Sequence, residues 1–443
     1  MGIELGIEAI SLLMVGTLVV LLLLGMPMAF ALGFVGVSFT LIFYGPKALV
    51  LISSRIYGFV NVYVLVAVPM FLMMASIMDK SGVARDLYRA ISIWAGGLRG
   101  GVAMMTLVAA VFMAATTGII GGEIILLGLV ALPQMLRLGY DKNLAIGTIC
   151  AGGSLGTMIP PSIVLIFYGL ATNVSIGDLF VAVVIPGLVL AGLYVAYILV
   201  RCYLNPALGP PLPLVERDIP LREKVALLKG IALPMGIAFG VLGSIYAGIA
   251  AVSEAAAVGV AGTLLAAWLR RELSWRMLRE CLQQTMTACG LLLWLTFGAN
   301  ALIGVYNLLG GIRYMNSLMT GLPLEPIVVV MLMMAVLIVL GLFMDWVGVL
   351  LLTMPIFVPI IKTLGFDPIW FGILFCMNMQ ISYLSPPFGP AAFYLKGVAP
   401  PEIRLQDIYR ALWPFMLLQI AGMFMVMFIP ELALWLPRML LSS

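Results

Sequence analysis

Long uninterrupted apolar runs constrain this chain more than any other feature of its sequence. Residues 10–24 and 327–343 contain no charged side chain, and 63% of all residues are hydrophobic against 9% charged. A soluble domain carries about 25% charged residues. At about 20 apolar residues per crossing, 443 residues allow about a dozen membrane elements. We therefore expect an all-α polytopic membrane protein in a lipid bilayer; alternating barrel strands are not present.

Missing residue types exclude several functions. The chain has no histidine, so the serine in Gly152-Gly153-Ser154-Leu155-Gly156 has no histidine base, and neither a zincin motif nor a transition-metal site is expected. It also has no GxxxxGK[ST] run, so it does not hydrolyse ATP through a P-loop. A net charge of +4, spread over loops, argues against nucleic-acid binding. These absences argue against an enzyme, and any active transport must use an ion gradient or the ATPase of another subunit.

A polar, proline-rich stretch divides the chain. It covers residues 205–230 and is predicted to be a cytoplasmic linker between a first half, 1–204, and a second half, 231–443, because basic residues favour the cytoplasmic side. Within it, 219–228 is equally compatible with an interfacial amphipathic helix and with a solvated connector. The predicted full spans are 9–25, 27–44, 58–78, 176–200, 231–247, 250–269, 281–300 and 411–436.

Each half contains one apolar interval that we interpret as a re-entrant hairpin. The interval at about 101–136 is flanked by basic residues on both sides, yet it is barely long enough for two crossings. The interval at about 326–361 has Asp345 near its middle and no basic residue. Two hairpins that enter from opposite faces indicate an inverted repeat.

The repeat is also visible as matching residues at one offset of 226. Nine identities fall within 36 gapless positions, against roughly two or three expected from composition. The matching residues are Pro133, Leu138, Gly139, Asp141, Cys150, Pro160, Pro161, Phe167 and Tyr168 with Pro359, Leu364, Gly365, Asp367, Cys376, Pro386, Pro387, Phe393 and Tyr394.

A helix broken at a double proline follows each hairpin, at about 141–170 and about 367–396. Proline and glycine release backbone carbonyls, which at membrane depth persist only where protein or a wet cavity satisfies them. Such helix ends suit a hard cation such as Na⁺. The hydroxyls of Ser154, Thr157, Ser382 and Ser385 would add oxygens. Simple kinks are the alternative; two breaks at matching positions favour the site.

These segments resemble a known family. The pairing of GYDKNLAIGTICAGGSLGTMIPPSIVLIFYG with GFDPIWFGILFCMNMQISYLSPPFGPAAFYL, together with SEAAAV at 253–258, is similar to the large membrane (M, DctM-type) subunit of tripartite ATP-independent periplasmic (TRAP) transporters. The resemblance implies an elevator, in which a transport domain moves against a scaffold in the bacterial inner membrane. It also implies Na⁺ symport, a small four-helix Q (DctQ-type) subunit and a periplasmic binding protein that delivers an organic acid anion.

The resemblance implies two sets of site residues, which adjoin the helix breaks already seen in the sequence. The first Na⁺ site would combine Thr116, Thr117 and Gly118 with Ser154, Gly156 and Thr157. The second would combine Asp345, Trp346 and Gly348 with Ser382, Leu384 and Ser385. The helix breaks are Pro160, Pro161, Pro386 and Pro387. The first tip departs from the serine-rich tip of many relatives, and nothing in the chain selects one organic acid.

Three carboxylates in apolar surroundings have two interpretations each, since each needs a partner or water. Asp345 lies at a predicted tip, where it either takes part in coupling or fixes the hairpin, or else caps the N-terminus of the helix that follows. The position of Glu123 at a helix start favours a structural role, and that of Glu254 favours a capping role.

Three other functions compete with a TRAP symporter. They are the permease of an ABC importer, a divalent-anion/sodium symporter that needs no binding protein, and an intramembrane aspartyl protease. The missing GxGD motif opposes the protease, and the doubled hairpin opposes the ABC permease.

Overall fold

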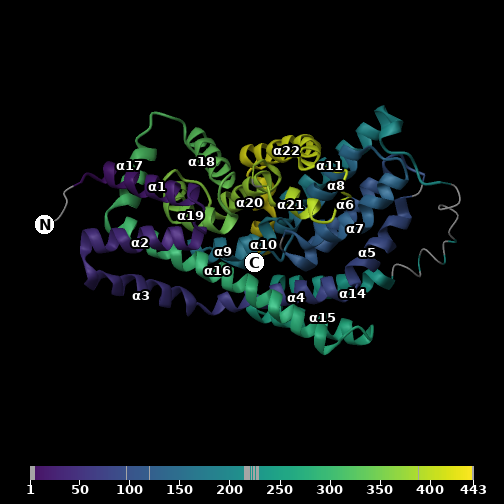
Figure 1. The fold of residues 1–443 in the computed structure, drawn as a ribbon, viewed down its shortest axis with the longest axis horizontal. Helices are drawn as coiled ribbons and strands as arrows, with labels where there is room; N and C mark the ends of the chain where they lie inside the picture. The colour runs from purple at the N-terminus through teal and green to yellow at the C-terminus, as the bar shows by residue number, and fades with distance from the viewer. Residues whose placement is uncertain are drawn as a thin grey trace.

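The described part of the chain is helical throughout. The computed structural model describes residues 5–95, 97–118, 120–213, 220, 222, 225, 229–387 and 389–441, and these contain no β-strand. Figure 1 shows the arrangement. The α-helices are α1 (Ile7–Leu23), α2 (Met28–Tyr44), α3 (Leu49–Val60), α4 (Ala67–Lys80), α5 (Val83–Ser92), α6 (Gly101–Thr117), α7 (Gly122–Arg137), α8 (Lys142–Ser154), α9 (Ile163–Thr172), α10 (Ile176–Ala182), α11 (Val184–Leu204), α14 (Lys229–Tyr246), α15 (Val252–Leu269), α16 (Trp275–Leu308), α17 (Gly311–Thr320), α18 (Pro326–Gly341), α19 (Trp346–Thr363), α20 (Pro368–Leu384), α21 (Pro390–Lys396), α22 (Leu405–Phe428) and α23 (Glu431–Leu441).

Six helical stretches of the described residues are long and apolar enough to span a membrane. They are Tyr63–Lys80, Ile176–Leu204, Val252–Leu269, Trp275–Leu308, Trp346–Thr363 and Leu405–Phe428. The last one corrects the predicted span 411–436. Its helix α22 ends at Phe428, and α23 begins at Glu431 after Pro430, because proline cannot continue the backbone ladder.

The predicted hairpins and broken helices are confirmed as helical elements. Helices α6 and α7 form the first hairpin, and α18 and α19 form the second. The first broken helix consists of α8, the 3₁₀ turn η4 (Leu155–Thr157) and α9, and the second consists of α20 and α21. In Figure 1 α20 and α21 lie between the two hairpins, and α8 lies beside α6 and α7; α8 contacts α6 and α7, and α20 contacts α18 and α19.

The two repeats share local structure as well as sequence. The carboxylate of Asp141 accepts a hydrogen bond from the Leu144 N–H at 2.9 Å at the start of α8. Its counterpart Asp367 accepts one from the Ile369 N–H at 2.7 Å at the start of α20. Both proline pairs are cis. The fold class predicted from the sequence, an all-α inverted repeat, is therefore confirmed.

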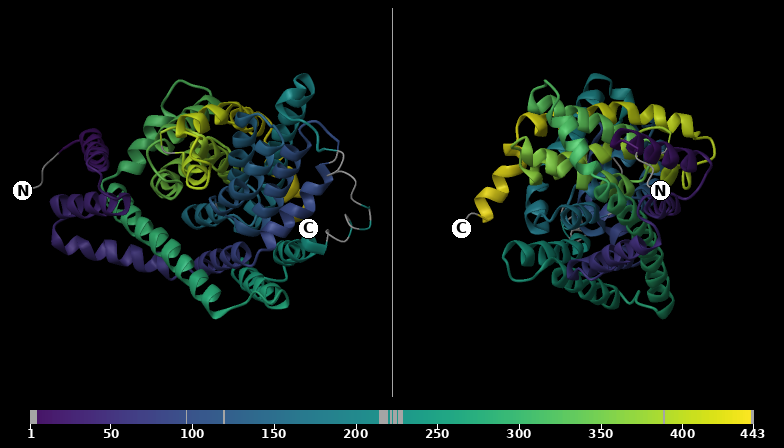
Figure 2. Two further views of the ribbon diagram at one scale, coloured as in Figure 1. Left: turned by 45° about the vertical axis from the view of Figure 1, so that its right-hand side comes forward. Right: turned by 90° about the vertical axis from the view of Figure 1, so that its left-hand side faces the viewer.

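An outer row of helices packs beside this central body. Helix α16 contacts α2, α3 and α4, and α15 contacts α4 and α14. Figure 2 (left) shows the row along the lower side of the molecule. A Cβ added at Gly36 of α2 would lie 2.6 Å from the backbone of Ala301 and Leu302 in α16. Small residues thus allow α2 and α16 to meet backbone to backbone, as in many membrane helix pairs.

Most of the predicted linker lies outside the residues that the structure describes. Within 205–230 the structure describes residues 205–213, which include the 3₁₀ turn η5 (Pro206–Leu208), and a few later positions. The amphipathic helix predicted at 219–228 lies outside the described residues, except for positions 220, 222 and 225. The boundaries of the two halves and the cytoplasmic placement of the linker stay predictions.

The backbone contact between α2 and α16 is testable by over-packing. We expect Gly36→Val to destabilise the folded chain by about 1–3 kcal/mol, because the added methyl groups meet backbone that cannot move aside. Gly16→Val on α1 is the control, since a Cβ there meets nothing within 4 Å. The thermal unfolding midpoint in detergent should fall for Gly36→Val alone; equal midpoints for both variants would contradict this packing.

Candidate functional site

The tip of the first hairpin lies against the first double proline. Gly118 ends α6 in the left-handed region, with φ +66°. Its carbonyl oxygen accepts a hydrogen bond from the N–H of Ile163 at 3.3 Å, at the start of α9. A Cβ at Gly118 would collide with the carbonyl oxygen of Pro161. Only glycine permits both this φ and this approach, so the sequence fixes tip and break in contact.

Two carboxyl side chains meet at this tip. The Thr117 hydroxyl donates a hydrogen bond to Glu123 Oε1, which closes the turn between α6 and α7. Glu123 is fully buried, and its Oε2 has no partner among the described residues. Asp79 of α4 lies against Gly122 in the same turn. The tip is therefore acidic, as the N-terminus of α7 favours.

The hydroxyls predicted for the first Na⁺ site bind carbonyls of their own segments. Thr116 donates to the Met113 carbonyl oxygen, which also lies 3.3 Å from the Thr117 hydroxyl; Ser154 donates to the carbonyl oxygen of Ala151, and Thr157 to that of Ser154. All four residues are buried, as is Gly156, and α6 packs on η4. The structure thus brings the two predicted segments together, although the neighbours of Gly118 are Pro161 and Ile163 rather than Ser154.

At the second hairpin, only part of the predicted set converges. Asp345, Trp346 and Ser382 line one cavity of about 220 Å³ beside the tip. Asp345 is exposed and occupies the N-cap position of α19, but its side chain makes no capping hydrogen bond. The backbone N–H groups of Trp346 and Val347 face this carboxylate, so Asp345 serves the start of α19 as well as lining the cavity.

The remaining residues predicted for the second Na⁺ site do not line this cavity. Gly348 lies against Met28 of α2, and the side chain of Leu384 is buried in the apolar cluster around the first hairpin. The Ser385 hydroxyl donates to the Ser382 carbonyl oxygen at 3.3 Å. Spacing alone could not show these directions, because successive residues of a helix point about 100° apart and tertiary packing decides which of them faces the cavity.

Three buried amides, which the sequence analysis did not single out, lie on helices around the breaks. Asn378 and Gln380 of α20 are fully buried, and Gln419 of α22 is 1% exposed. Asn378 donates to the Met334 carbonyl oxygen, and Gln380 donates to the Ser154 carbonyl oxygen at 2.7 Å. An amide inside an apolar run was the available signal, since burial of an amide requires partners.

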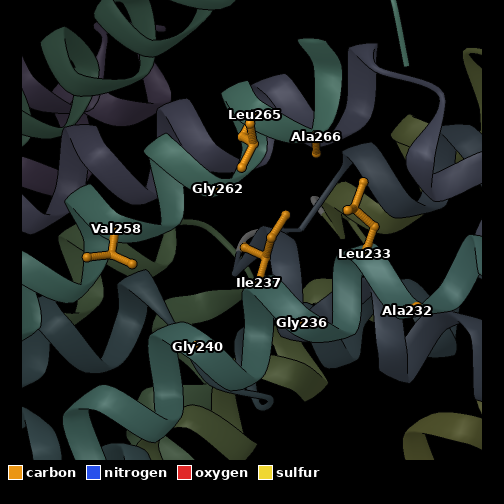
Figure 3. A pocket seen from close by; sticks show the side chains of 9 residues that line it. All are labelled: Ala232, Leu233, Gly236, Ile237, Gly240, Val258, Gly262, Leu265 and Ala266. Atoms are coloured by element: carbon orange, nitrogen blue, oxygen red, sulfur yellow. The ribbon is translucent and has the colours of Figure 1, made fainter. Parts of the chain in front are cut away.

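Not every cavity or carboxylate belongs to the site. The groove between α14 and α15 in Figure 3 has a volume of about 250 Å³ and is lined only by apolar residues and glycines. It offers no group to hold an ion. Glu254 accepts a hydrogen bond from the Ala251 N–H at 2.9 Å and caps α15, in line with the structural interpretation.

Comparison with known proteins decides the family. Residues 15–432 match the model of the tripartite ATP-independent periplasmic transporter, DctM component. The C4-dicarboxylate TRAP transporter large permease protein DctM of Pseudomonas aeruginosa is 32% identical over 409 residues, which cover 91% of this chain and 93% of the relative. This chain belongs to the DctM family. Its membership excludes the ABC permease as an alternative, because the family is ATP-independent.

Other DctM-family relatives differ in the solute for which they are named. The ectoine/5-hydroxyectoine TRAP transporter large permease protein UehC of Ruegeria pomeroyi is 27% identical, with 96% of this chain and 98% of the relative covered. Among solved structures, the Alcanivorax borkumensis YdaH transporter has a TM-score of 0.64 at 16% identity, over 89% of this chain and 90% of that chain. That likeness concerns the fold alone. The chain is thus a multi-pass TRAP large permease.

The contact between the first tip and the first break is testable at Gly118. We expect Gly118→Ala to destabilise this DctM-family protein by about 2 kcal/mol or more, because it adds a collision with the Pro161 carbonyl to the cost of a positive φ. Gly365→Ala is the matched control, since its φ is +81° but nothing lies within 4 Å of the added Cβ. Thermal unfolding midpoints measure the difference, and a Gly365→Ala shift as large as that of Gly118→Ala would contradict the contact.

Proposed function

We propose that this TRAP large permease imports an organic acid anion together with Na⁺ across the bacterial inner membrane. A periplasmic binding protein delivers the anion, and a small four-helix Q subunit completes the membrane complex. The observation that carries the proposal is the pairing of two hairpin tips with two helix breaks. Each pairing gathers oxygens, buried at the first break and lining a cavity at the second, and oxygens are the ligands of a hard cation.

Na⁺ fits both breaks for the same physical reasons. At the first break, Ser154 and Thr157 supply carbonyl and hydroxyl oxygens, and the Glu123 carboxylate lies at the adjoining tip. At the second, Asp345 and Ser382 line one cavity. A carboxylate near each break offsets the charge of a cation in a medium of low dielectric. Two such places support at least two Na⁺ ions for each anion.

An elevator movement fits the way in which the tips meet the outer helices. At the second tip, Gly348 packs against Met28 of α2. At the first tip, Gly122 packs against Asp79 of α4. Neither Met28 nor Asp79 forms a hydrogen bond or ion pair to its tip within the described residues. Contacts without directional bonds can be exchanged at little cost. We therefore propose that hairpins and broken helices move as one body along the outer row.

Uptake into proteoliposomes tests this function. Liposomes would contain the chain with its neighbouring small subunit, and candidate organic acids would be added outside with and without the cognate binding protein. We expect uptake only with an inward Na⁺ gradient and only with the binding protein, because the permease receives its solute from that partner. Choline replaces Na⁺ in the control vesicles.

The other outcomes of this experiment separate the alternatives. Na⁺-driven uptake that needs no binding protein would favour a divalent-anion/sodium symporter. Uptake that continues unchanged when choline replaces Na⁺ would contradict Na⁺ coupling. Because relatives are named for solutes as different as C4-dicarboxylates and ectoine, the solute panel should include both classes.

A further inference from the structure

The side chain of Gln380 connects the two broken helices. It belongs to α20 in the second half, and it is fully buried. Its Nε2 donates one hydrogen bond to the carbonyl oxygen of Ser154, at 2.7 Å, and another to Thr157 Oγ1. Both acceptors belong to the first break, where the proposed function places a cation. An amide of the second half thus occupies oxygens of the first site.

The repeat explains why these residues meet. Gln380 lies 226 positions after Ser154, which is the offset that relates the two halves, so each is the counterpart of the other. Two counterparts that touch must lie beside the pseudo-two-fold axis between the repeats. Any ligand bound at the Ser154 carbonyl therefore lies within reach of both halves.

Oxygen atoms without partners surround this contact. Gln380 Oε1, Gln419 Oε1 and the hydroxyls of Tyr194 and Tyr383 are buried and have no hydrogen-bond partner among the described residues. The Tyr194 hydroxyl faces Ser154 and Gln419, and that of Tyr383 faces Thr157. Leaving a polar atom buried and unpaired costs about 1–3 kcal/mol. The tyrosine hydroxyls can donate to these neighbours, whereas Gln380 Oε1 can only accept, so Gln380 Oε1 is the unpaired atom that points to a missing positive ligand.

The chemistry of a primary amide suits such a place. Its NH₂ group donates to the same oxygens that a cation would bind, whereas its oxygen is itself a cation ligand. Rotation about the terminal torsion exchanges the two groups without a change in volume. The Gln380 NH₂ group would have to withdraw when a cation reaches the Ser154 carbonyl, and the rotation would bring the unpaired Oε1 to the ion.

We propose that Gln380 is a ligand switch of the first cation site. Without the ion, its NH₂ group holds the Ser154 and Thr157 oxygens; with Na⁺ bound, its Oε1 joins them as a ligand from the second half. This inference rests on the proposed Na⁺ coupling and adds a residue and a direction to it. Ion binding at the first break is thereby sensed by α20, the helix that also carries the Ser382 side of the second site.

Two substitutions separate the roles of the donor and the oxygen. Gln380→Met removes both, and Gln380→Glu keeps an oxygen ligand of the same shape but loses the donor. The readout is the thermal unfolding midpoint of the purified complex, titrated with NaCl at constant ionic strength against choline chloride. Gln134→Met is the control, since Gln134 of α7 accepts a hydrogen bond from the hydroxyl of Tyr88 in α5 at 2.9 Å, away from both helix breaks.

We expect opposite responses from the two variants. Gln380→Met should need about tenfold or more Na⁺ for half of its stabilisation, because one ligand is lost. Gln380→Glu should unfold at a lower temperature than wild type without Na⁺, and Na⁺ should raise its midpoint by more than it raises that of wild type. Gln134→Met should keep the wild-type Na⁺ response.

A structural role for Gln380 predicts a different pattern. Both variants would then lose stability equally at every Na⁺ concentration, and this result would overturn the ligand switch. The ligand switch is also wrong, while Na⁺ coupling stands, if both variants reach half of their stabilisation at the same Na⁺ concentration as wild type. If wild type shows no Na⁺ response, the proposed Na⁺ coupling fails first, and the two failures are thereby distinguished.

Discussion

Backbone carbonyls that leave the helix ladder inside an apolar medium must find partners within the protein, and this constraint organises the centre of the molecule. Each double proline releases such carbonyls. At the first break, Ile163 donates its N–H to the hairpin tip, and Gln380 donates its amide to the Ser154 carbonyl. The first hairpin and the two broken helices are thus parts of one hydrogen-bonded unit.

The two halves interlock through exchanged contacts. Phe167, in the half-helix after the first break, packs edge-on against Trp346 at the second tip, with ring centroids 5.8 Å apart. Tyr394, in the half-helix after the second break, lies over Gly121 at the first tip. Each tip therefore rests on the opposite half as well as on its own break. An ion that orders one break would therefore change the packing of both tips. Such an interaction between separate sites is what coupled transport requires.

Much of this architecture could be predicted from the sequence because it follows from local rules. Apolar runs, double prolines and the offset of 226 indicated the hairpins and broken helices. Proline interrupts a helix at its own position, and charged residues mark the ends of membrane segments locally. The elevator, the linker and the Na⁺ ligands stay predictions. The second site illustrates what spacing cannot give. Asp345 and Ser382 share a cavity, whereas Leu384 lies in an apolar cluster and Ser385 donates to the Ser382 carbonyl oxygen. The role of Gln380 could not be predicted from the sequence, because its hydrogen-bond partners lie in the other repeat.

The central claim is that cations bind at the helix breaks, and a direct test is a density comparison. Two high-resolution cryo-electron microscopy maps of the membrane complex, one in Na⁺ and one in choline, would be subtracted. The account predicts a difference peak among the Ser154, Thr157 and Gln380 oxygens, and a second beside Asp345 and Ser382. Maps without a difference at either break, with the same hydrogen bonds in both salts, would contradict it.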